Sequence, residues 1–199
     1  SSGLVGRNLM FHPYAHVHGY VDEPLDGNHG PPLCLWSHEF YETDPRRDFV
    51  RGYSWQLSRG AGTLSDAIAG AASGRLPWGA AHHGAMRRFT NHRIGMSAIC
   101  EDLPEEHNRV TLDPELKDGH GIPAPHISYT LSDNSRRMMA HGTARAKEIL
   151  AAAGASHIGG ESPLMMAGWH LLGTARMGDD PARSVVNSWG RSHDVPNLF

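Results

Sequence analysis

The sequence predicts an α+β fold in which a helix covers an antiparallel β-sheet. Several short runs of β-forming residues lie between turn residues, and one longer stretch carries apolar residues at helical spacing. The 23 glycines and 13 prolines indicate many loops, although they are too few to make disorder the default interpretation. With 199 residues and 39% hydrophobic content, the chain is long enough for one domain and part of another.

Several stretches of the sequence are predicted to be strands. Residues 1–60 alternate short apolar stretches with Gly, Pro, Asn and His, which indicates short strands and long loops. Residues 94–100 and 109–112 are strand-like and bounded by turn residues, and residues 126–130 follow as a third strand after the turn-rich stretch 118–125. We expect these last three strands to form one antiparallel sheet.

The clearest predicted element is a helix that ends before Gly154. Ser132 or Asp133 can cap its start, and Gly154 stands where a glycine commonly ends a helix. Its predicted buried face consists of Met139, Gly142, Ala146, Ile149 and Ala153. A glycine in mid-helix costs about 1 kcal/mol relative to alanine, so Gly142 suggests close approach of another segment. A short helix is also expected over residues 64–72.

Charge and composition exclude several classes of partner. The formal net charge is −3 with no long run of one sign, which argues against a nucleic-acid backbone or an anionic membrane. No apolar run approaches the roughly 18 residues of a membrane span, and no targeting segment is recognised. The compartment stays open, with the cytoplasm favoured. Cys34 and Cys100 are too few for a disulfide framework and too far apart for a CxxC site.

The 15 histidines raise the possibility of a metal site. His12, His16 and His18 are close in sequence, and alternate residues of a strand such as His16 and His18 would share a face. However, no Cys, Asp or Glu completes a recognisable ligand spacing. We therefore predict no metal site and interpret these side chains as scattered surface histidines, with a His-rich metal-binding protein as the less favoured alternative.

His170 is the candidate for acid–base chemistry. It stands between Trp169 and the turn at Gly173 and Thr174, with few charges nearby, so we expect its ring to be partly desolvated. Desolvation lowers the pKa of an imidazole and keeps it neutral near pH 7, as a general base requires. The competing interpretation is a core histidine hydrogen-bonded to the backbone.

The same region carries a family resemblance. Residues 170–181, followed by residues 184–187 and 191–199, resemble the C-terminal signature of the glucose-methanol-choline (GMC) flavoprotein oxidoreductases. Residues 5–12 resemble the segment in which the chain of that family leaves its FAD domain. Residues 100–113 resemble part of its substrate-domain sheet.

The resemblance implies an activity and a site. The family oxidises alcohols or sugars by passing a hydride from the carbinol carbon to N5 of FAD, while a base takes the hydroxyl proton. His170 stands where the family places this base. Trp169 and Met177 become candidate substrate-pocket residues, and Asn8 and Asn197 candidate cofactor contacts. The implied partner is a small alcohol or sugar, and the electron acceptor stays open.

The resemblance also implies a domain order. Residues 1–13 would be a remnant of the FAD-domain exit, residues 14–165 the substrate domain, and residues 166–199 the start of the return to the FAD domain. The G-x-G-x-x-G fingerprint of the FAD domain is absent. Residues 119–124 fit the looser G-x-G-x-x-A pattern, but Pro123 rules out the helix that must follow. We therefore expect a substrate domain with half an active site, inactive by itself.

Other features fit a piece of a longer polypeptide. The sequence begins without Met and ends on the strand-like pair Leu198 and Phe199. The second catalytic His or Asn of the family would lie beyond Phe199, and His193 is not that residue. Asn187 stands where the family commonly has Asp. The alternative to an enzymatic function is a non-catalytic binding or interaction module of the same fold.

Overall fold

A computed structural model describes residues 2–27, 29–60, 63–163 and 170–199. The chain forms two compact units, and each is described by itself. The sheet unit comprises residues 13–101 and 134–167, and the terminal unit comprises residues 1–12, 102–133 and 168–199. The predicted α+β fold class is confirmed, whereas the assignment of individual segments to a substrate domain and an FAD domain stays a prediction.

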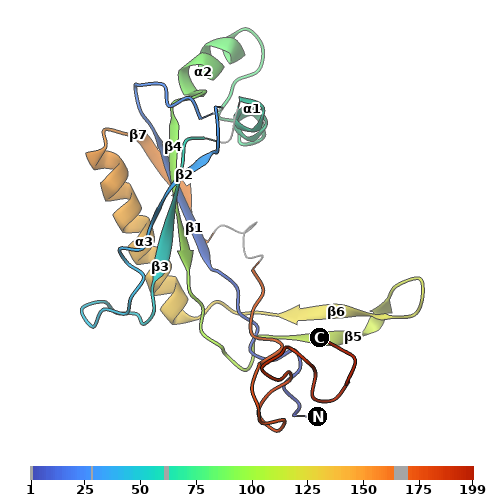
Figure 1. The fold of residues 1–199 in the computed structure, drawn as a ribbon. Coiled ribbons are helices and arrows are strands. Elements are labelled where there is room, and N and C mark those ends of the chain that lie inside the picture. Colours follow the sequence, from blue (N-terminus) through green and yellow to red (C-terminus); the bar gives the residue numbers. More distant parts are fainter. Residues whose placement is uncertain (1, 28, 61–62, 164–169) are drawn as a thin grey trace. The chain divides into compact units, whose positions relative to one another are not determined.

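A five-stranded antiparallel sheet forms the centre of the sheet unit (Figure 1). In spatial order its strands are β2 (Leu33–Ser37), β3 (Tyr53–Ser58), β4 (Arg93–Cys100), β1 (Tyr14–Tyr20) and β7 (Ser156–Glu161). Burial alternates along β1, where Ala15 and Val17 are buried while His16 and His18 are half-buried on the opposite face. The predicted pairing of His16 and His18 on one face is therefore confirmed.

Helix α3 (Asp133–Ala152) packs on this sheet. It begins directly after Ser132, one of the two predicted caps, and Gly154 beyond its end has a φ of 79°, as expected of a left-handed glycine cap. A Cβ on Gly142 would lie 3.0 Å from the Cβ of Ala98 in β4. The absence of a side chain at Gly142 thus permits the close approach that the sequence suggested.

The buried face of α3 differs from the prediction. The residues it buries are Ser135, Met138, Met139, Gly142, Ala146 and Leu150. Ile149 is 43% exposed and Ala153 is exposed, so their assignment to the core is wrong. The reason is geometric: each residue advances about 100° around a helix, so a face through Met138, Ala146 and Leu150 leaves Ile149 at its margin.

Two shorter helices complete the sheet unit. Helix α1 (Thr63–Ala72) confirms the prediction for residues 64–72. Helix α2 (Ala81–Phe89) was not predicted, and none of its residues is buried. Its nine residues carry an apolar face too short to be distinguished in the sequence.

The terminal unit contains a separate two-stranded antiparallel sheet of β5 (Arg109–Lys117) and β6 (Pro123–Ser128). The expectation that these strands share a sheet with residues 94–100 is wrong, because β4 is already paired with β1 on one edge and β3 on the other. Strand β5 also continues past its predicted end at Leu112, through an irregularity in register that accommodates Pro114. None of the described helices has the length and hydropathy of a membrane span.

Asn108 joins the segments of the terminal unit. Its side chain is buried, its Nδ2 donates to the Thr130 carbonyl at 3.1 Å, and its Oδ1 accepts from the Thr130 amide at 2.7 Å. Its own carbonyl accepts a bond from the Leu9 amide at 2.8 Å. One buried asparagine thus ties the N-terminal segment to the hairpin.

Candidate active site

The backbone around His170 is fixed by a short antiparallel bridge. The Met10 amide donates to the Leu172 carbonyl and the Leu172 amide donates to the Met10 carbonyl, both at 3.0 Å. The next residue, Gly173, has a φ of 88°, and a Cβ there would lie 2.0 Å from the carbonyl oxygen of Asn8. Only glycine allows the two segments to approach this closely.

This register places His12 opposite His170. In an antiparallel pair, the residue two positions after Met10 faces the residue two positions before Leu172. The ring centroids of His12 and His170 are 5.1 Å apart and the ring planes meet at 87°, an edge-to-face contact. The sequence showed His12 only as a candidate metal ligand, because the pairing of segments far apart along the chain has no local signal.

The His170 side chain is exposed in the terminal unit. The expected partial desolvation is therefore wrong for the described residues, and so is the interpretation as a core histidine. The apolar neighbours in sequence do not cover the ring, because Leu171 and Leu172 are themselves exposed. Trp169, the other expected neighbour, lies outside the described residues. As described, the ring is open to a reactant.

Asn8 has a structural function in this unit. It is 5% exposed, with a φ of 61°. Its Nδ2 donates to the Pro104 carbonyl at 3.1 Å, and Arg176 Nη2 donates to its Oδ1 at 3.0 Å. Both ends of the amide are thus engaged inside the protein. Arg176, for which the sequence predicted no role, thus anchors the segment after Gly173 to the N-terminal segment.

A second network holds the turn after Met177. Ser184 is buried, and its hydroxyl donates to the Asp180 carbonyl at 2.6 Å. His193 Nε2 lies 2.9 Å from Ser184 Oγ and 3.0 Å from the Gly178 carbonyl oxygen. His193 therefore stabilises a turn.

Asn187 also stabilises a turn. Its Oδ1 accepts hydrogen bonds from the backbone amides of Trp189 at 3.0 Å and Arg191 at 3.1 Å. An aspartate carboxylate can accept the same two bonds. Asparagine in place of the aspartate that is common in the family is therefore compatible with this turn.

The remaining predicted residues of the terminal unit do not converge on a pocket. Met177 is 58% exposed, so it is not a core residue of this unit. Asn197 is exposed in a turn, and no described residue hydrogen-bonds to its amide. Leu198 and Phe199 are not in a strand.

The residues present do not form a dinucleotide site. Residues 119–124 lie in the turn that leads into β6, and β6 starts at Pro123, so no helix N-terminus follows the glycines. Of the two predicted cofactor contacts, the Asn8 amide is already hydrogen-bonded within the protein, and the Asn197 side chain remains exposed. A flavin dinucleotide would therefore need residues in addition to those described here.

In the sheet unit, the sheet face opposite α3 is polar. His16 Nδ1 lies 2.8 Å from Ser97 Oγ, and Arg93 Nη2 lies 3.1 Å from His16 Nε2. The His18 ring stacks on His16 with centroids 5.8 Å apart. Within the described ranges, no three His, Cys, Asp or Glu side chains are grouped as metal ligands. Such a face can hydrogen-bond hydroxyl groups.

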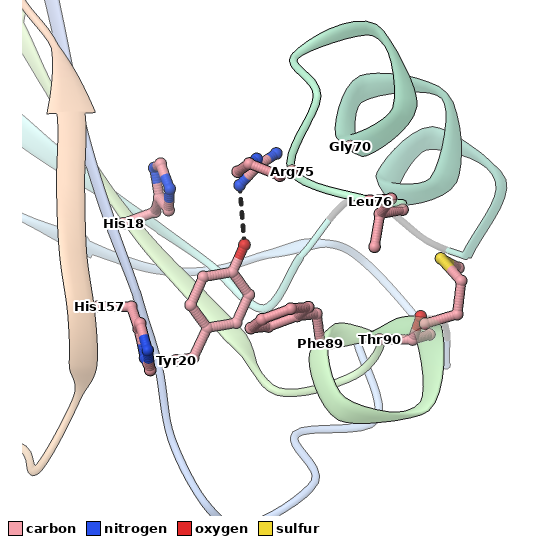
Figure 2. Close-up of a pocket in the computed structure, with 9 residues that line it drawn as sticks. His18, Tyr20, Gly70, Arg75, Leu76, Phe89, Thr90 and His157 are labelled. Atoms are coloured by element: carbon pink, nitrogen blue, oxygen red, sulfur yellow. Dashed lines mark hydrogen bonds between the residues drawn. The ribbon is translucent and has the colours of Figure 1, made fainter. Parts of the chain in front are cut away.

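A cavity of about 230 Å³ lies beside this face, where α1 and α2 meet β1 (Figure 2). Burial is the main cause that lowers the pKa of His18 to about 4, and the charges of Arg93, His16 and Arg75 lower it further. His18 is thus neutral at physiological pH. The cavity was not predicted, because part of its wall is α2, which was not predicted from the sequence.

Comparison with known proteins connects this chain to one family. The family profile described as GMC oxidoreductase matches residues 104–199. The whole chain is similar to 2-methyl-1,2-propanediol dehydrogenase of Mycolicibacterium austroafricanum, with 39% identity over 37% of that protein. It is also similar to the fructose dehydrogenase large subunit of Gluconobacter japonicus, with 31% identity over 36% of its length, and to paromamine 6'-oxidase of Streptomyces fradiae, with 41% identity over 34%. The chain therefore spans about a third of the length of these relatives.

Proposed function

The chain belongs to the GMC oxidoreductase family, and from this premise we propose that it is part of an FAD-dependent enzyme that oxidises an alcohol or sugar CH–OH group. Relatives that match along its whole length are dehydrogenases or an oxidase by name, and those names point to a small diol and to sugars.

The observation that carries this proposal is the His12–His170 pair. The Met10–Leu172 bridge fixes the backbone beside His170, its ring is exposed, and the His12 ring limits its rotation from one side. A neutral imidazole with one nitrogen directed at an alcohol can accept the hydroxyl proton as a general base. A fixed ring direction matters because proton transfer requires hydrogen-bond geometry at the moment of reaction.

The described residues do not form a complete binding site for the flavin. When bound, FAD supplies the acceptor for the hydride. The contribution of residues 1–199 is to orient the imidazole, to hold the proton on His170, and to offer hydrogen-bonding groups for the substrate.

The test uses the complete product of the gene that encodes residues 1–199, supplied with FAD and offered 2-methyl-1,2-propanediol and fructose. We expect His170→Ala to slow flavin reduction by about 10²–10⁴-fold, the usual contribution of a general base, and to retain FAD. His120→Ala is the matched control, since His120 is an exposed histidine of the same unit in a hairpin turn. Flavin reduction at the unaltered rate in His170→Ala would refute the assignment.

The second candidate function comes from a different class of protein. A chain with this fold and no flavin site would be a non-catalytic binding module. Sequencing the DNA on both sides of this reading frame discriminates the two candidates. A strand, a G-x-G-x-x-G turn and a helix encoded upstream favour the enzyme, and stop codons on both sides favour the module.

A further inference from the structure

The cavity between α1, α2 and the sheet has one polar and one apolar side (Figure 2). The polar side is formed by His18 and Tyr20 of β1 and by Arg75, which follows α1. The apolar side is formed by Leu76, Met86 and Phe89. A ligand that fits both sides has a polar head and a compact apolar body.

The polar side offers hydrogen-bond donors and one positive charge. Arg75 Nη1 donates to the Tyr20 hydroxyl at 2.8 Å, so the hydroxyl hydrogen of Tyr20 is left to donate elsewhere. Arg75 Nε donates to Ser73 Oγ at 3.1 Å, and its Nη2 has no partner in the described part of the chain. Among the described residues that line the cavity, none is an Asp or Glu. The guanidinium charge is therefore not neutralised within it.

His18 extends this donor surface. Neither of its ring nitrogens has a hydrogen-bond partner among the described residues, and Nδ1 is buried. Burial and the nearby positive charges keep the ring neutral, so it carries one N–H. A buried polar atom without a partner is costly, and a ligand that accepts a hydrogen bond from this ring would offset that cost.

We propose that this cavity binds a small organic carboxylate, with the carboxylate at Arg75, Tyr20 and His18 and the body of the ligand against Leu76 and Phe89. Arginine binds carboxylates through strong charge-assisted hydrogen bonds. A neutral alcohol fits less well, because it brings no negative charge to the Arg75 guanidinium. The site belongs to the sheet unit and does not depend on the role proposed for His170.

The test is calorimetric titration of the complete gene product with benzoate and with benzyl alcohol, which share a ring and differ in the head group. We expect benzoate to bind at least tenfold more tightly, about the effect of one charge-assisted hydrogen bond. Arg75→Met retains most of the side-chain stem and removes the charge, and it should weaken benzoate binding by 10- to 100-fold while leaving benzyl alcohol within threefold.

Arg87→Met is the matched control, because Arg87 is an exposed arginine of α2 that does not line the cavity. It changes the net charge equally and should leave benzoate binding within threefold. Tyr20→Phe retains the ring, removes one donor and provides a second variant, with an expected loss of about fivefold. Equal binding of the two probes, no benzoate binding, or unchanged affinity in Arg75→Met would overturn the proposal.

The carboxylate can be one end of the reacting alcohol or a separate ligand. Competitive inhibition of turnover by benzoate would indicate the first source, and benzoate binding that persists under saturating substrate would indicate the second. Direct binding needs no turnover, so failure of the proposed oxidation and failure of this site give different results.

Discussion

Replacing Gly173 with alanine should open the segment that carries His170. Gly173 has a φ of 88°, and a residue with a Cβ pays about 1–2 kcal/mol to adopt such a left-handed conformation. In addition, the new Cβ would lie 2.0 Å from the Asn8 carbonyl oxygen, so the two segments must separate. Overpacking of this kind costs about 1–3 kcal/mol, which gives a total of about 2–5 kcal/mol.

The measurement is amide hydrogen exchange in peptides that contain Met10 and Leu172, whose backbone bonds form the bridge. A loss of 2 kcal/mol corresponds to about thirtyfold faster exchange where local opening limits protection. Gly190→Ala is the control, because Gly190 has a φ of 76° but its added Cβ would meet nothing within 4 Å. It introduces the conformational strain alone, at another turn of the same unit. Equal exchange at Met10 and Leu172 in both variants would refute the role assigned to the close approach.

Three further outcomes are expected. His12→Ala should reduce the rate of flavin reduction by about tenfold with KM little changed. His12→Phe retains a ring beside His170 and should keep most of the rate. Identical rates in the two variants would contradict a role for this ring contact in orienting His170. Because the pKa of His18 is lowered to about 4, the free energy of unfolding is at its full value above pH 6.5 and falls as the pH drops toward 4. In His18→Gln, this loss of unfolding free energy between pH 6.5 and 4 should be smaller by about 1–2 kcal/mol, after allowance for solvent screening, in an acid denaturation experiment. Asn108→Leu removes both hydrogen bonds to Thr130 and should destabilise the terminal unit by about 2–4 kcal/mol, measured by urea unfolding.

Local signals in the sequence predicted the elements that depend on local chemistry. The start and the glycine cap of α3 were predicted correctly, because capping involves residues within one turn. The core of β4 was predicted from its strand-forming residues and flanking turns. Helix α2 was missed because its apolar face spans only nine residues, too few for helical periodicity to stand out.

The sequence by itself determined the α+β class, the bounds of the longest predicted helix and the family to which the signature around His170 belongs. Only the tertiary structure decided that β4 lies between β1 and β3, that His170 is exposed, and that His12 faces it. The physical reason is that strand pairing and side-chain burial depend on which distant segments meet. Local sequence limits those partners through chain geometry and pattern, but it does not select among them.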